Sequence, residues 1–345
     1  MRRLISTALA PTGPKAGRSC ARSPLLMTAL LSLFIALSSL CSGAGEAAVS
    51  PWALSTISYS NSLSLTSFDQ SEELTYNPQY TMQLQLNPTY RFGQVGLLSA
   101  NLSLLQELTN SDVTTRQREL QATDATVAFR SRPWVFGASG LSAVGGLSAA
   151  LPTSPWSQAQ TMIAAFAANG SLRWAPGSWL FLGYQLNLQR RLYRYTTGAL
   201  KSPRVSECAF SAAGCAAFLN SGVRNPAWVS THALFAASNP LPWLSCSASV
   251  AWITSHLYPT AETEEVRFTA QAPSDERGFT SYGLEVAAQP HSTFEIALQA
   301  NTFNPQLRPG GGYYAPFFNR FTALALQLRY RPANTLSRTE ALQQN

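Results

Sequence analysis

The chain has 345 residues, and 12% of them are charged, about half the share found in an average soluble domain. Its mean hydropathy is nonetheless −0.03, because uncharged polar residues replace the missing charges. The isoelectric point of about 9.3 arises largely from the first 47 residues, since the rest of the chain holds 19 basic and 16 acidic residues. This charge balance gives no support to nucleic-acid binding.

The N-terminal segment has the order of a secretory signal peptide. Basic residues come first, an uncharged apolar run follows from Leu25 to Leu40, and a stretch rich in small residues occupies 42–48. We therefore expect a signal peptide over 1–47, cleaved near Ala47 or Ala48. Serines interrupt the apolar run, and nothing after it approaches the roughly eighteen apolar residues of a transmembrane helix, so no helical membrane domain is expected.

Alternating apolar and polar residues mark the strands of the mature chain. At 80–92 every even-numbered residue is apolar or aromatic and every odd-numbered residue is polar, which places all apolar side chains on one face of a strand. The length of about a dozen residues suits a tilted membrane crossing, and aromatic residues mark both ends as an interfacial girdle would. In chain order, the clearest segments are 57–65, 80–92, 180–189, 294–301 and 324–330.

Weaker alternation in seven further segments brings the total to about twelve strands, an even number as in bacterial barrels. These segments are 98–104, 120–130, 141–151, 162–174, 228–237, 244–254 and 279–288. We therefore predict an all-β fold, a transmembrane antiparallel up-and-down β-barrel of about 12 strands over 48–331.

The connections between these strands alternate in length. The short ones, expected to be periplasmic turns, are 93–96, 131–140, 175–178, 239–242 and 289–292. The long ones, expected to face the cell exterior, include 195–227, 255–278 and 304–320. A soluble sandwich would have no reason to alternate in this way.

The signal peptide, the alternating strands and the apolar final strand ending at Tyr330 together resemble a Gram-negative outer-membrane β-barrel protein, without matching one specific barrel family. The resemblance implies contact with outer-membrane lipid and lipopolysaccharide, whose phosphates would meet Arg190 and Arg194 on the lipid-facing phase; a solvated rim is the alternative. The final strand resembles the signal read by the barrel-assembly machinery, although a short polar tail, 332–345, follows it. The oligomeric state is open.

Inward-facing residues form the candidate pore wall. On the polar phase, near the periplasmic ends of their strands, lie Arg91, Arg130, Arg173 and Arg329. A ring of guanidinium groups there would favour anions. Alternatively, these arginines pair with acidic residues and brace the barrel; the candidates are Asp124, Glu285 and Glu295. The remaining pore-lining candidates are Gln185, Asn187, Gln189 and Arg191.

The long connection 195–227 carries two of the three cysteines that remain after signal-peptide cleavage. Cys208 and Cys215 lie close together and would see an oxidising compartment, so we expect them to form a disulfide. This loop either folds into the barrel as a constriction or stays at the surface. Cys246 falls on the lipid-facing phase, where it would act as a small hydrophobe.

An enzymatic alternative depends on Ser230 and His232, which lie two residues apart on one strand face. They would place a nucleophile and a base on the same side, but a third group must orient the histidine. We expect this pair to face inward, away from bilayer lipid, and to be structural. No spacing indicates a zinc site or a phosphate-binding loop, so we predict no metal and no cofactor.

The leading functional hypothesis is a passive, porin-like channel for small polar solutes. The alternatives are an outer-membrane enzyme that modifies lipids, similar to a phospholipase or a lipid A deacylase, and a barrel whose exterior loops bind a ligand or partner.

Overall fold

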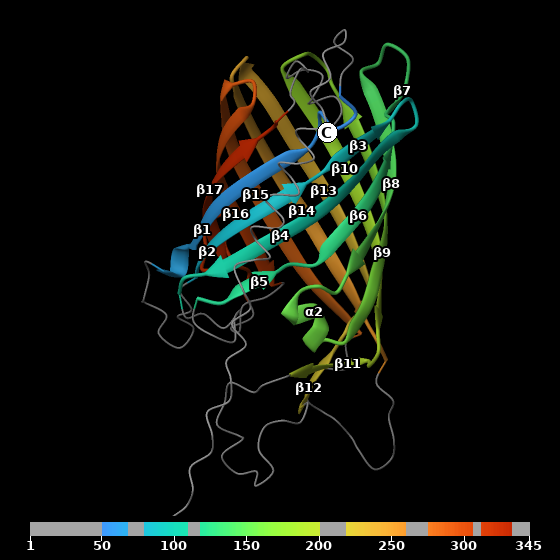
Figure 1. Ribbon diagram of the computed structural model, residues 1–345, viewed down its shortest axis with the longest axis vertical. Coiled ribbons are helices and arrows are strands. Elements are labelled where there is room, and N and C mark those ends of the chain that lie inside the picture. The colour runs from blue at the N-terminus through green and yellow to red at the C-terminus, as the bar shows by residue number, and fades with distance from the viewer. Residues whose placement is uncertain are drawn as a thin grey trace, which may run out of the picture. The chain divides into compact units, whose positions relative to one another are not determined.

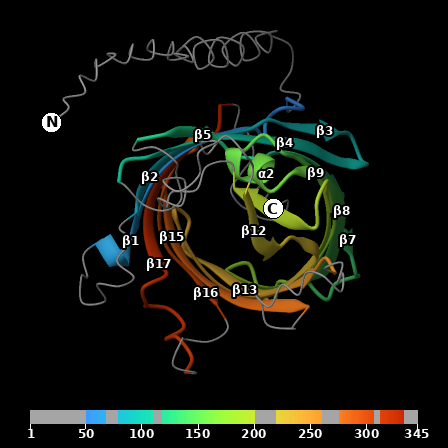
Figure 2. The same ribbon diagram turned by 90° about the horizontal axis from the view of Figure 1, so that it is seen from below.

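The computed structural model describes residues 50–67, 79–109, 118–200, 219–259, 275–305 and 312–332. In these residues twelve antiparallel strands form one closed barrel, which Figure 2 shows as a ring (Figures 1 and 2). The strands that cross the barrel wall are β1 (Thr56–Ser64), β2 (Tyr80–Asn87), β4 (Gly96–Glu107), β6 (Ala125–Ser131), β8 (Leu141–Leu151), β9 (Met162–Trp174), β10 (Leu180–Tyr193), β13 (Pro226–Leu241), β14 (Leu244–Leu257), β15 (Glu276–His291), β16 (Phe294–Pro305) and β17 (Thr322–Tyr330).

Shorter elements extend these strands. They are η1 (Leu65–Ser67), β3 (Thr89–Phe92), β5 (Leu120–Ala122), β7 (Trp134–Val135), α2 (Pro155–Ala159), β11 (Thr197–Leu200) and β12 (Leu219–Arg224). Each wall strand pairs with its neighbours in the chain, and β1 pairs with β17 to close the ring. The predicted fold class and strand number are therefore confirmed.

The predicted strand 80–92 is interrupted at Pro88. A proline has no N–H to give to a ladder, so β2 ends before it and β3 begins after it. The register against β4 does not change across the interruption, and the Pro88 carbonyl still accepts a hydrogen bond from the Ala100 amide at 3.0 Å. The alternation of faces predicted for 80–92 is thus kept.

The predicted strand 120–130 is also split, and here the register changes. Leu104 opposes Ala122 of β5, whereas Gly96 opposes Ser131 of β6, a shift of one residue around Thr123 and Asp124. The Asp124 carboxylate accepts hydrogen bonds from the Ser154 amide at 2.9 Å and from the Ser157 hydroxyl. These bonds hold the start of α2, so the prediction that Asp124 pairs with lumen arginines is wrong.

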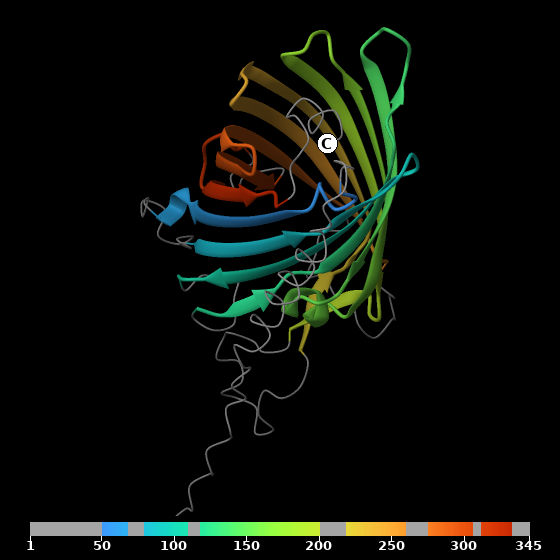
Figure 3. The same ribbon diagram turned by 45° about the horizontal axis from the view of Figure 1, so that its top comes forward.

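The two ends of the barrel differ in their connections. The described N-terminal residues, the end of β17 and the short hairpins lie at one end, which includes the β7–β8 hairpin at the top of Figure 3. We call this the periplasmic end, because short turns face the periplasm in bacterial barrels. The short β11–β12 ribbon and α2 lie at the other end (Figure 1). Cys208 and Cys215 lie outside the described residues.

The outer face of the wall is mostly apolar. It exposes aliphatic side chains such as Leu298 and Leu326, with aromatic side chains toward both ends, among them Trp174 and Trp243 at the periplasmic end and Trp228 and Trp252 toward the other. Such a surface suits the hydrocarbon core of a bilayer, and the aromatic side chains form girdles at its two interfaces. Cys246 lies on this face, as predicted, and is not disulfide-bonded. None of the described helices is both long and apolar enough to cross a membrane.

Asn225 ties the exterior end of the wall together. Its side chain is buried, and its amide nitrogen Nδ2 donates to the carbonyl oxygens of Gln160 at 3.1 Å and Tyr195 at 3.0 Å. These bonds link the end of the β8–β9 connection and the start of the β10–β13 connection to the start of β13.

Replacing Asn225 by alanine is expected to lower the free energy of unfolding by about 2 kcal/mol, because two carbonyls lose the hydrogen bonds that the buried Asn225 amide donates. Urea unfolding of the protein in lipid vesicles measures this loss. The matched control is Asn239→Ala, since the Asn239 side chain makes no hydrogen bond to the described residues. Equal stability of the two variants would contradict the assigned role.

Candidate functional site

The inner face of the wall is mostly polar and uncharged. Gln185, Asn187 and Gln189 of β10 alternate with the outward apolar residues of that strand, as predicted, and Arg191 continues this inner row. The Arg191 Nε donates to the Gln189 side chain at 2.7 Å. Across the lumen wall, serines, glutamines and asparagines form further bonds of this kind, such as that from Gln83 to Ser103 at 2.7 Å.

Arg329 belongs to a charge-balanced cluster. Its guanidinium contacts Glu285 at 2.6 Å and Glu295 at 2.5 Å, and Glu295 also pairs with Arg331 at 3.0 Å. We call these four residues the balanced cluster. Gln299 adds a hydrogen bond to Glu285, and the Arg329 and Glu295 side chains are only 25% and 8% exposed. Ion pairing of Arg329 with Glu285 and Glu295, the alternative to a ring of free arginines, is therefore what the structure shows.

The other three predicted arginines lie on a separate part of the wall. Arg91 lies on β3, Arg130 on β6 and Arg173 on β9, whereas the balanced cluster lies on β15, β16 and the end of β17. By strand order the two groups occupy different arcs of the ring. The four arginines therefore do not form one uniform ring.

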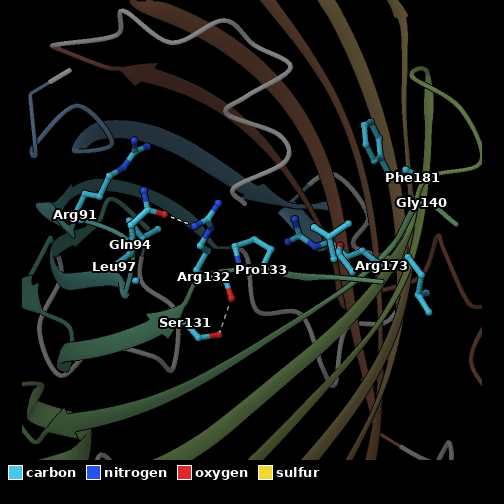
Figure 4. A pocket seen from close by; sticks show the side chains of 15 residues that line it. Arg91, Gln94, Leu97, Ser131, Arg132, Pro133, Gly140, Arg173 and Phe181 are labelled. Atoms are coloured by element: carbon cyan, nitrogen blue, oxygen red, sulfur yellow. Dashed lines mark hydrogen bonds between the residues drawn. The ribbon is translucent and has the colours of Figure 1, made fainter. Parts of the chain in front are cut away.

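A cavity of about 760 Å³ opens at the periplasmic end beside these arginines (Figure 4). Arg91, Arg132 and Arg173 line it, and no carboxylate is among its described lining residues. Arg130 is not among the lining residues, but it lies opposite the lining residue Leu97 in the wall. We call this space the basic cavity. Arg132 was not predicted, because it follows the end of β6 and strand alternation alone does not place it.

A row of residues across three strands positions Arg173. Gly183 of β10 opposes both Arg173 of β9 and Phe235 of β13. The Phe235 ring lies over Gly183, and the Arg173 guanidinium carbon lies 5.8 Å from the centre of that ring. A cation held over an aromatic face is attracted by it, so the ring supports Arg173 at the cavity wall. The inward phase of Phe235 could have been read from its alternation with Leu234.

Gly183→Ala is expected to displace Phe235 without unfolding the barrel. An added Cβ would lie 2.9 Å or less from three atoms of the ring, and the ring is free to swing toward the lumen because these are the far atoms of the side chain. We expect a lower single-channel conductance. The double variant Gly183→Ala with Phe235→Ala should restore it; if it stays low, the clash is not the cause.

The predicted orientation of Ser230 and His232 is wrong. Both share the outward phase of Trp228 and Leu234, and His232 makes a hydrogen bond through Nδ1 to the Tyr184 hydroxyl at 2.7 Å. The pair thus faces lipid, but Ser230 makes no hydrogen bond to His232 in the described part of the chain. No group of three or more metal-binding side chains occurs among the described residues.

Arg190 faces outward as predicted, and aromatic rings hold it. Its guanidinium lies over the rings of Trp228 at 5.2 Å and Tyr258 at 5.1 Å and donates to the Ala227 carbonyl at 3.2 Å. This places a fixed positive charge at the exterior girdle. Arg194, just past the end of β10, lies over the Tyr195 ring at 5.6 Å.

Comparison with solved structures identifies the fold. No protein-family model matches the sequence, and no curated protein matches it. The COG4313 outer membrane channel from Pseudomonas putida F1 superposes with a TM-score of 0.51 at 10% sequence identity, over 80% of this chain and 94% of that one. The chain has the fold of an outer-membrane channel.

Two further barrels are similar at lower scores. The KdgM porin gives a TM-score of 0.42 at 7% identity over 80% of this chain and 98% of that one, and the NanC porin gives 0.42 at 8% identity over 79% and 97%. The outer-membrane channel fold and its apolar outer face place the protein in the bacterial outer membrane, as predicted from the sequence.

Proposed function

We propose that this protein is a passive outer-membrane channel for small polar solutes and that it favours anions. The observation that carries the proposal is a group of arginines at the periplasmic mouth. One arc holds Arg91, Arg130, Arg132 and Arg173. The other arc is neutral, since Glu285 and Glu295 offset two arginines. Positive charge in a pore lining raises the local concentration of anions.

The size and chemistry of the barrel support passage of small solutes. Twelve strands enclose more space than the eight-stranded barrels that side chains fill, and less than the sixteen-stranded porins. The uncharged polar residues of the inner face offer hydrogen bonds to water and to polar solutes along the wall, which lowers the cost of desolvating a solute.

Single-channel recording of the refolded protein in a planar bilayer tests this function. We expect stable conductance. Under a salt gradient, the sign of the reversal potential should show that anions permeate more readily than cations. Liposome swelling with small sugars would measure passage of neutral polar solutes in the same preparation. A folded barrel that never conducts would overturn the proposal.

A second candidate function, lipid hydrolysis, is favoured by one observation, the lipid-facing position of His232 beside Ser230. Against it, the hydrogen bond that activates a serine is not formed in the described residues, and the His232 Nδ1 is used by Tyr184. Phospholipid hydrolysis by the purified protein, compared with Ser230→Ala, decides between the two. Turnover that the Ser230→Ala variant loses would make the protein an enzyme.

A further inference from the structure

We infer that the basic cavity is a binding site for small aromatic carboxylates, and that compounds of this class are the preferred solutes of the channel. This inference rests on the proposed channel function and names the substrate class. It arises from the mixture of side chains in the cavity. Three arginines share its lining with Leu97 and Phe181, and a site for simple inorganic anions would have no reason to present these apolar side chains (Figure 4).

The arginines of the cavity suit a carboxylate. A guanidinium group offers a planar fork of donors that matches the two oxygens of a carboxylate, and charge-assisted hydrogen bonds of this kind are the strong ones. Arg132 is held at the cavity edge by a hydrogen bond to Gln94, and Arg173 is held over Phe235. Because their positions are fixed by neighbours, less conformational freedom is lost when a ligand binds.

The apolar side chains of the cavity suit a compact ring. Figure 4 shows Arg91 and Arg132 on one side of the space and Arg173 with Phe181 on the other, so a bound carboxylate and an attached ring would contact both kinds of surface. Arginine also stacks on aromatic faces, which favours an aromatic ligand over an aliphatic one. The volume of about 760 Å³ is within the usual range of small-molecule sites and leaves room for water.

Calorimetric titration of the folded, detergent-solubilised protein tests the site without requiring conduction. The probes are benzoate, acetate and benzamide, because acetate keeps the charge without the ring and benzamide keeps the ring without the charge. We expect benzoate to bind at least about tenfold more tightly than either of the others. Equal binding of benzoate and acetate would overturn the inference.

Variants assign the binding to this cavity. Arg173→Gln should weaken benzoate binding about tenfold, and Phe181→Ala should weaken benzoate but leave acetate unchanged. The control is Arg190→Gln, which removes an arginine from the outer face. If Arg173→Gln and Phe181→Ala bind benzoate as the unmodified protein does, the ligand lies elsewhere and the inference fails.

Recording from the same preparation separates this inference from the proposed function. Anion-favouring conductance without selective benzoate binding would contradict only the substrate class. Benzoate binding that depends on Arg173 and Phe181 in a barrel that never conducts would contradict only the channel function and leave the site in place.

Discussion

Replacing the four arginines of the basic arc, Arg91, Arg130, Arg132 and Arg173, together by glutamine is expected to abolish the anion preference of the channel. These four side chains carry the charge of the basic arc, and the rest of the mouth is balanced by Glu285 and Glu295. In 0.1 M salt the screening length is about 10 Å, so their field reaches ions in the lumen. The anion-to-cation permeability ratio, obtained from the reversal potential, should fall from several-fold to about one.

The controls for this experiment come from the exterior end of the barrel, away from the periplasmic mouth. Arg190→Gln and Arg194→Gln remove the same charge from residues that lie over aromatic rings at the exterior girdle, and both should keep the original selectivity. Raising the salt to 1 M should weaken the preference of the unmodified channel, since the screening length falls to about 3 Å. Unchanged selectivity in the fourfold variant would show that the arginines do not set it.

The fold was predictable because each strand of a membrane barrel separates lipid from water. That requirement imposes an alternation of period two that survives in the sequence even where single strands are short. The prediction failed in detail where backbone chemistry intervened: Pro88 lacks a donor, and the register shift near Asp124 frees its carboxylate to hold α2. Alternation along one strand contains no information about either event.

The candidate site was predictable only in part, because pairing depends on which strands are neighbours. Alternation placed Arg329 on the inner face, but its contact with Glu285 reaches across β16 from β17 to β15, which alternation along one strand does not reveal. The orientation of Ser230 and His232 was wrong for a different reason. A polar residue on the lipid face is tolerated when its polar group is satisfied, here by Tyr184 on the neighbouring strand.

The double variant Glu285→Gln with Glu295→Gln is expected to shift selectivity in the opposite direction, toward stronger anion preference. The amides keep the shape of the balanced cluster but leave Arg329 and Arg331 without their countercharges, so the neutral arc becomes positive. The permeability ratio should rise above that of the unmodified channel, and the free energy of unfolding should fall by about 1–2 kcal/mol, because a half-buried arginine loses its ionic partners.

Adding Arg329→Gln to this double variant distinguishes charge from distortion. If the selectivity change comes from an unbalanced guanidinium, removing that group should reduce the excess anion preference while the barrel stays folded. A folded barrel is recognised by a gel mobility that differs between unheated and heated samples. If the triple variant keeps the full excess, the two glutamates act by holding the wall in shape. The opposite signs expected for the basic arc and the balanced cluster mean that a general loss of pore structure cannot mimic both results.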